Sequence, residues 1–344
     1  MKQTKGKRNE YFDILKGATI ILVIIGHCIV LGSSKEYYEN SLYLDNWLHK
    51  IIYSFHMPTF MLISGFFFYY TIQKYTANQI VKSRITSLLI PIIVWQMLYI
   101  TILTIINNGS FTIHTYINHS YFHALWFLWS VIWNSFIVLI IHHFFKDKLL
   151  AYSMLFIATL FLPNKFHIHQ FVFMYPYFLC GYFINKIHNT DNKQVMSFIS
   201  SKLSLLVFPI YIFLIALYER QHYVEVSGTC IVLHDKISFY MIKTDIFRWT
   251  IGIVGSACFC MFISYLSKSN FPQLKSLLQY LGTITLGIYI ISDYVFTFFH
   301  YLPIHHIHPF LIVIETIAVT TISVLLIIII KKNKYINKFL LGGR

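Results

Sequence analysis

Of the 344 residues in this chain, 57% are hydrophobic and only 12% are charged. Soluble domains carry about 25% charged residues, so this composition excludes a soluble protein and predicts an all-α, polytopic integral membrane protein. The net charge of +14 would suggest nucleic-acid binding in a soluble chain, but basic residues gather in the cytoplasmic loops of membrane proteins, and no nucleic-acid partner is expected.

Ten apolar segments are predicted to cross the bilayer as helices, which satisfy their backbone polar groups internally. They cover residues 13–31, 51–70, 85–107, 122–141, 149–163, 169–187, 203–219, 247–267, 277–299 and 309–330. The fifth segment is short, so nine or eleven spans remain possible. Since no loop is long enough for a soluble domain, a single transmembrane domain over residues 1–344 is predicted.

Lys and Arg residues are divided unequally between alternate loops. The loops on the side of the N-terminus hold 19 of them and the opposite loops hold 7, while Lys16 lies inside the first segment. Cytoplasmic loops carry the excess of basic residues in membrane proteins. Both termini are therefore predicted to lie in the cytoplasm.

The first apolar segment contains Asp13, Lys16 and His27. At about 100° per residue, Lys16 and His27 lie about 20° apart on one helix face, and Asp13 lies about 40° to the other side of His27. Ionisable groups inside a membrane are costly and mark functional sites, so the three are predicted to face the bundle interior, with His27 as the main catalytic candidate. The structural alternative is a snorkelling Lys16 and a His27 bonded to a neighbouring helix.

A second histidine, His56, precedes Pro58 in the second segment. Because this segment enters from the outer side, His56 can match the depth of His27. Two histidines at one level can divide acid and base work, or one can orient the other. A packing role beside a proline kink is the alternative.

Lys82 and Arg84 lie at the predicted cytoplasmic end of the third segment. Their charges can hold the phosphates of a soluble anionic donor. For Lys82, the excess of basic residues in cytoplasmic loops is a sufficient explanation.

Five sequence motifs follow one another along the chain. They are Arg8 to His27, with ten residues between Lys16 and His27; SFHMPTFMLISGFFF from residue 54; RITSLLIP from residue 84; HALWFLWSVIW at 123–133; and LGTITLGIYIIS at 281–292. Together they resemble the membrane acyltransferase-3 family, and most closely its subgroup acting on sugars and surface polysaccharides.

The resemblance implies transfer of an acyl group, usually acetyl, from cytoplasmic acyl-CoA to a hydroxyl of a glycan or lipid-linked sugar. Acyl-CoA would be a substrate, no bound cofactor is expected, and the location would be a bacterial cytoplasmic membrane. By its position in the first motif, His27 corresponds to the family's catalytic histidine. Lys16 stands where many members have Arg, and the correspondence of Arg84 to the third-motif Arg is weaker.

The other residues that match family motifs are expected to contact the acceptor or to line its pocket. Trp126 and His123 belong to the fourth motif. The late motif departs from the family, because Ser292 stands where a His is common, and Asp293 follows it. This departure indicates either a divergent acceptor site or a weakened activity.

Two catalytic routes follow from His27. It can act as general base on the acceptor hydroxyl, or take the acyl group itself and pass it outward. A transporter or flippase for a polysaccharide or lipid-linked sugar is the alternative function, although the inverted repeats common in transporters are not found. A catalytically inactive relative is a third possibility.

No metal site is expected. The five cysteines are scattered without metal-ligand spacing. Four histidines can in principle bind a metal, but Pro303 and Pro309 indicate an irregular loop around them; they are His300, His305, His306 and His308.

Overall fold

The computed structural model describes residues 9–31, 38–106, 125–162, 168–190, 206–229, 239–299 and 309–343. Every regular element in these ranges is a helix, which confirms the all-α class.

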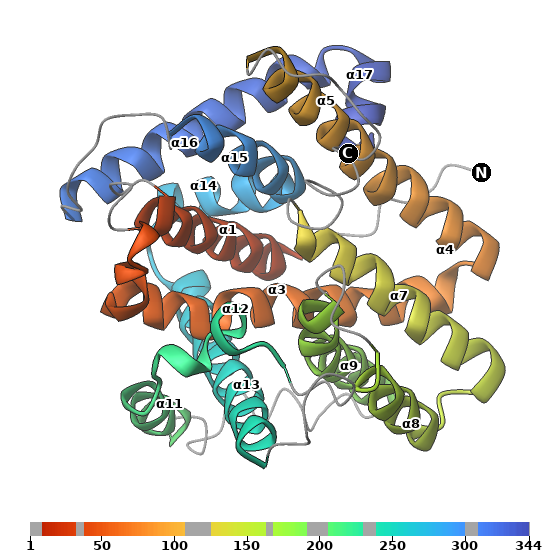
Figure 1. Cartoon of the computed structure of the whole chain (residues 1–344). Coiled ribbons are helices and arrows are strands. Elements are labelled where there is room, and N and C mark those ends of the chain that lie inside the picture. Colours follow the sequence, from red (N-terminus) through yellow and green to blue (C-terminus); the bar gives the residue numbers. More distant parts are fainter. Residues whose placement is uncertain are drawn as a thin grey trace.

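Helix α1 (Glu10–Leu31) lies at the centre of the bundle (Figure 1). It packs between α3 (Trp47–Lys74) and α14 (Pro272–Thr283). Helices α9 (Ile168–Thr190) and α13 (Phe239–Lys268) also pack against α3. The helices around this centre are α4 (Ala77–Arg84), α5 (Ile90–Ile106), α7 (Trp126–Phe145), α8 (Leu149–Thr159), α11 (Val207–Ala216), α15 (Thr285–Phe299), α16 (Pro309–Lys331) and α17 (Lys334–Leu341).

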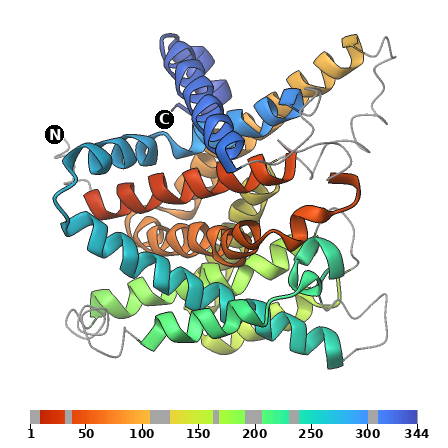
Figure 2. The ribbon, with the colours of Figure 1, turned by 90° about the vertical axis from the view of Figure 1, so that its left-hand side faces the viewer.

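Short helical turns complete the structure. The 3-10 turns are η1 (Leu42–Asp45) and η4 (Arg220–His222), and α12 (Val224–Ser227) follows η4. A π-helical turn, η2 (Ile85–Leu89), joins α4 to α5. In Figure 2, η4 and α12 lie at the end of the bundle where α1 ends and α3 and α13 begin.

Two helix pairs approach so closely that only glycine fits at the contact. A Cβ added at Gly65 in α3 would lie 1.9 Å from the Phe178 carbonyl oxygen, and one at Gly181 in α9 would lie 2.0 Å from the Leu62 carbonyl oxygen. Gly282 in α14 makes the same kind of approach to α1. Small residues drive helix association in membranes in this way, because lipid removes the hydrophobic force that operates in water.

Gly181→Ala is therefore expected to push α9 away from α3 and to destabilise the protein by about 1–3 kcal/mol, the usual range for overpacking. Thermal unfolding of the purified protein in detergent measures the effect. Gly287→Ala is the matched control: its Cβ would meet the end of the flexible Ile327 side chain at 2.8 Å rather than backbone. Equal melting temperatures for the two variants would contradict this account of the α3–α9 contact.

Six described helices are long and apolar enough to cross a membrane, or seven if the bent pair α14 and α15 counts as one span. The predicted number of ten is therefore not confirmed. Two predicted spans are short helices, α8 with 11 residues and α11 with 10, and at 1.5 Å per residue each covers about half of the hydrocarbon thickness. Helix α9 is not among the six, although it has 23 residues.

The predicted ninth span, 277–299, differs from the expected continuous helix. It is divided into α14 and α15, which meet at an angle of 79°. A Cβ at Gly282 would lie 1.9 Å from the Asp13 carbonyl oxygen, so the last turn of α14 is pressed against the first turns of α1. The break lets α14 follow α1 while α15 turns toward α16, with which it packs.

Candidate functional site

A cavity opens at the end of the bundle where α1 ends and α3 begins. It encloses about 100 Å³ of free space, and α1, α3, α7, α9, α13, α15 and residues 218–225 all contribute to its wall. The lining residues that carry the argument below are His27, Tyr53, His56, Trp126, Gln170, Tyr218, His222, Tyr223, Glu225, Arg248 and Tyr289.

His27 lines the cavity one helical turn after Val23, which lines it as well. The imidazole packs edge-on against Phe296, with ring centroids 5.4 Å apart. Its Nδ1 is buried and has no hydrogen-bond partner among the residues that the structure describes. Buried polar atoms in proteins are nearly always hydrogen-bonded, so this atom is suited to meet a substrate.

His56 reaches the same cavity from α3 and is only 3% exposed. Its Nδ1 lies 2.7 Å from the Ile52 carbonyl oxygen. A carbonyl only accepts, so Nδ1–H donates, and Nε2 of the neutral ring is left with a lone pair that can take a proton. Helices α1 and α3 approach each other closely near His56, because a Cβ added at Gly26 would lie only 2.8 Å from the Tyr53 ring.

Asp13 and Lys16 do not reach this cavity. They pair with each other, with Lys16 Nζ 2.9 Å from an Asp13 carboxylate oxygen, and Lys16 also lies 5.6 Å from the centre of the Phe67 ring. His27 follows Lys16 by eleven positions in α1, which is about 16 Å along the helix. The structure therefore divides the predicted catalytic residues into two groups.

Arg84 lies at the end of the bundle opposite His56. Its guanidinium stacks on the Phe68 ring, 5.0 Å from the centroid, and Phe68 follows His56 by twelve residues, about 18 Å along α3. Lys82, two residues earlier in α4, is exposed. Arg84 directly precedes the π-helical turn η2, a distortion that often marks functional sites.

The predicted acceptor residues are only partly brought together. Trp126 lines the cavity. Ser292 is buried and its Oγ donates to the Tyr289 carbonyl oxygen at 3.2 Å; in the described lining of the cavity, Tyr289 contributes while Ser292 and Asp293 do not. His123 lies outside the described residues, as does the group His300, His305, His306 and His308.

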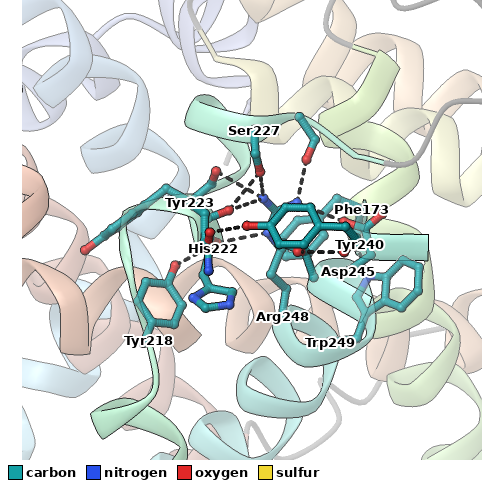
Figure 3. A network of polar contacts seen from close by, with 12 residues as sticks. Phe173, Tyr218, His222, Tyr223, Ser227, Tyr240, Asp245, Arg248 and Trp249 are labelled. Atoms are coloured by element: carbon teal, nitrogen blue, oxygen red, sulfur yellow. Dashed lines mark hydrogen bonds and ion pairs between the residues drawn. The ribbon is translucent and has the colours of Figure 1, made fainter. Parts of the chain in front are cut away.

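Arg248 is not among the predicted site residues, although it lies at the start of the predicted span 247–267. In the structure Arg248 is 2% exposed and pairs with Asp245 at 2.8 Å. Its Nε donates to the His222 carbonyl oxygen at 3.0 Å, and one Nη donates to the Gln221 carbonyl oxygen at 2.8 Å (Figure 3). The available signal was the Asp-x-x-Arg spacing at the start of an apolar segment, which places both side chains on one helix face.

His222 also lines the cavity, from a segment that precedes α13. Its Nδ1 accepts a hydrogen bond from the Glu219 backbone N–H at 2.8 Å, so the neutral ring carries its proton on Nε2. Burial, reinforced by the nearby Arg248 charge, lowers the pKa of His222. The ring is therefore a neutral hydrogen-bond donor at pH 7.

Two curated relatives show sequence similarity to parts of the chain. Nodulation protein NolL of Sinorhizobium fredii is 42% identical over 92 residues, which cover 26% of this chain and 23% of that protein. Nodulation protein NolL of Mesorhizobium japonicum is 28% identical over 190 residues, covering 51% of this chain and 47% of that protein. The matches thus span less than half of each relative's length, and no solved structure matches the chain.

The family comparison covers most of the sequence. Residues 9–332 match the family model described as an acyltransferase domain. This range includes every helix from α1 to α16 and every residue named above as a lining residue of the cavity. The chain therefore belongs to the membrane acyltransferase-3 family.

Proposed function

We propose that this protein transfers an acyl group, most simply acetyl, from acyl-CoA to a hydroxyl of a cell-surface polysaccharide or lipid-linked sugar. The observation that carries the proposal is the meeting of His27 and His56 in one cavity of an acyltransferase-family chain. The cavity offers a buried nitrogen without a partner in the described structure and a second imidazole oriented by a backbone carbonyl.

In the first route His27 takes the proton of the acceptor hydroxyl. The hydroxyl oxygen then attacks the thioester carbonyl carbon, the carbon–sulfur bond breaks, and the CoA thiolate leaves and receives the proton. General-base assistance of this kind contributes about 10²–10⁴-fold to a rate.

In the second route a ring nitrogen of His27 attacks the thioester carbonyl carbon, the carbon–sulfur bond breaks, and the CoA thiolate leaves and takes the ring proton of His27. The acceptor hydroxyl then attacks the acyl carbon, the carbon–nitrogen bond breaks, and the hydroxyl proton passes through His56 to His27. His56, with Nε2 as its proton acceptor, is then the base for that hydroxyl. This route suits a donor and an acceptor that approach from opposite sides of the membrane.

The donor is assigned to the end of the bundle that holds Lys16 and Arg84. The sequence analysis predicts this end to be the cytoplasmic side, because Lys16 lies near the N-terminus and Arg84 at the predicted cytoplasmic end of the third segment. The long flexible arm of CoA would then carry the thioester along α1 toward His27. Arg84, which stacks on Phe68 and directly precedes the π-helical turn η2 at this end, is the candidate for contact with the CoA phosphates.

The function is tested with purified protein in nanodiscs, radiolabelled acetyl-CoA and a glycan extract. Release of CoA and transfer of label to the extract are expected.

A flippase would instead leave acetyl-CoA intact. Transporter sites commonly use broken helices in both halves of the fold, and one bent pair, α14 and α15, occurs in the described residues.

Arg84→Ala is expected to raise KM for acetyl-CoA about 10-fold with little change in kcat, because it removes a charge-assisted contact made equally before and during reaction. Steady-state kinetics with varied acetyl-CoA measure this. Lys82→Ala is the matched control, since Lys82 is an exposed cation two residues earlier, and its kinetics should equal those of wild type. A similar rise in both variants would indicate a general effect of surface charge and count against a site at Arg84.

A further inference from the structure

Residues 218–225 contribute to the cavity wall. They belong to the segment 218–229, which is held against α13 by hydrogen bonds from Arg248. Beyond His222 and Gln221, the guanidinium donates to the Tyr223 and Gly228 carbonyl oxygens and to Ser227 Oγ. All donor groups of the side chain are thereby engaged, including those bound to Asp245. Arg248 therefore has no N–H group left to donate to a ligand.

A second set of contacts holds the same segment from the side. Arg220 forms a two-pronged ion pair with Asp45 in η1. Tyr223 OH lies 3.2 Å from His49 Nδ1 and 3.3 Å from the Leu44 carbonyl oxygen. The buried contacts of Arg248 and Tyr223 therefore fix the segment against α13 and the start of α3, and the side chains that it presents to the cavity are preorganised.

Those side chains suit a polyhydroxylated ligand. His222 offers an N–H, Glu225 offers carboxylate oxygens, and Tyr218 and Tyr223 offer aromatic surface. Gln170, on α9, adds an acceptor: it is 9% exposed, and its Oε1 has no hydrogen-bond partner among the described residues. An unpartnered buried oxygen in a cavity wall calls for a donor such as a sugar hydroxyl.

The described lining of the cavity carries one negative charge that no cation in the lining compensates. Glu225 is the one carboxylate in the described lining, and Arg248, the one arginine there, is neutralised by Asp245. A carboxylate or phosphate on the ligand would face Glu225 without compensation, and like charges brought together at an interface are strongly disfavoured.

We propose that Gln170, His222 and Glu225 form an acceptor subsite that selects a neutral or amino-bearing sugar unit and rejects an acidic one. The inference rests on the proposed function, because it names the acceptor class of that same cavity. Glu225 is the discriminating residue, and Gln170 and His222 bind hydroxyl groups.

The test uses three methyl glycosides of one ring type as acceptors: methyl glucoside, methyl glucosaminide and methyl glucuronide. Acetyl transfer from acetyl-CoA in nanodiscs gives kcat/KM for each. Wild type should favour the first two over the glucuronide by about 10-fold or more, and Glu225→Gln should remove most of that preference. Glu219→Gln is the matched control, because Glu219 lies in the same segment but not in the cavity lining, and it should keep the wild-type ratio.

Gln170→Leu gives a second measurement. It should raise KM for methyl glucoside about 10-fold while KM for acetyl-CoA stays unchanged, because a buried acceptor that pairs only with the sugar is lost. A parallel rise in both KM values would indicate a general disturbance of the cavity and overturn the role of Gln170.

The outcomes separate the two proposals. Donor turnover by wild type with equal preference for the three glycosides, with no transfer to any of them, or with a preference that Glu225→Gln leaves intact overturns the acceptor subsite alone. Absence of donor turnover with every acceptor, including the glycan extract, overturns the proposed function and the subsite with it.

Discussion

Replacement of His27 by alanine is expected to lower acyl transfer by about 10²–10⁴-fold, the usual contribution of a positioned acid–base group. The fold should survive, because His27 Nδ1 makes no hydrogen bond within the described structure and alanine is the best helix former. The measurement is acetyl transfer from labelled acetyl-CoA at matched amounts of folded protein, judged by size-exclusion profile and melting temperature.

His143→Ala is the control for this experiment. His143 is exposed near the end of α7 and does not line the cavity, so its replacement should leave the rate unchanged. A His27→Ala protein with wild-type activity would contradict both catalytic routes.

The same preparation distinguishes the base from the acyl carrier. Wild-type protein mixed with labelled acetyl-CoA in the absence of acceptor should retain label if His27 holds the acyl group, and His27→Ala should retain none. If His27 acts only as a base, neither protein retains label although wild type still transfers it to an acceptor.

Replacement of Arg248 by methionine is expected to be the most destabilising change, by about 3–5 kcal/mol, since it removes the compensating charge of Arg248 from the buried Asp245 carboxylate. Asp245 is 2% exposed. The expected readouts are a lower melting temperature and faster proteolysis of the 218–229 segment, whose carbonyl groups lose the guanidinium that holds them.

The double variant Asp245→Asn, Arg248→Met removes both charges and should be more stable than Arg248→Met alone, because no uncompensated carboxylate remains. Arg220→Met is a control from the same segment. Its partner Asp45 is exposed, and exposed pairs contribute little, so the melting temperature should hardly change. A double variant less stable than the single one would contradict the buried-charge explanation.

Much of the architecture could be predicted from local pattern. Apolar runs and scarce charges determine a helical membrane protein, and the positions of Asp13, Lys16 and His27 on one stripe follow from the 3.6-residue period alone. That pattern singled out His27, which does line the cavity, and the pairing of Asp13 with Lys16 is the contact expected three residues apart on a helix.

Other features depend on how helices meet. The bend between α14 and α15 is coupled to the approach of Gly282 to the Asp13 backbone, a contact between residues 269 positions apart. The short helices α8 and α11, predicted as full spans, show that apolar composition does not determine helix length. Hydropathy shows only that a segment can be buried. Where the helix bends and ends depends on its packing against neighbouring helices.

The sequence by itself determined the fold class, the family motifs and the catalytic candidate His27. Only the tertiary structure decided that His56 and Trp126 share its cavity, that Arg84 stacks on Phe68, and that Arg248 supports the cavity wall. The physical reason is range: helical period and charge patterning act within a few residues, whereas a site is made by side chains from helices whose contacts are set by close packing of distant segments.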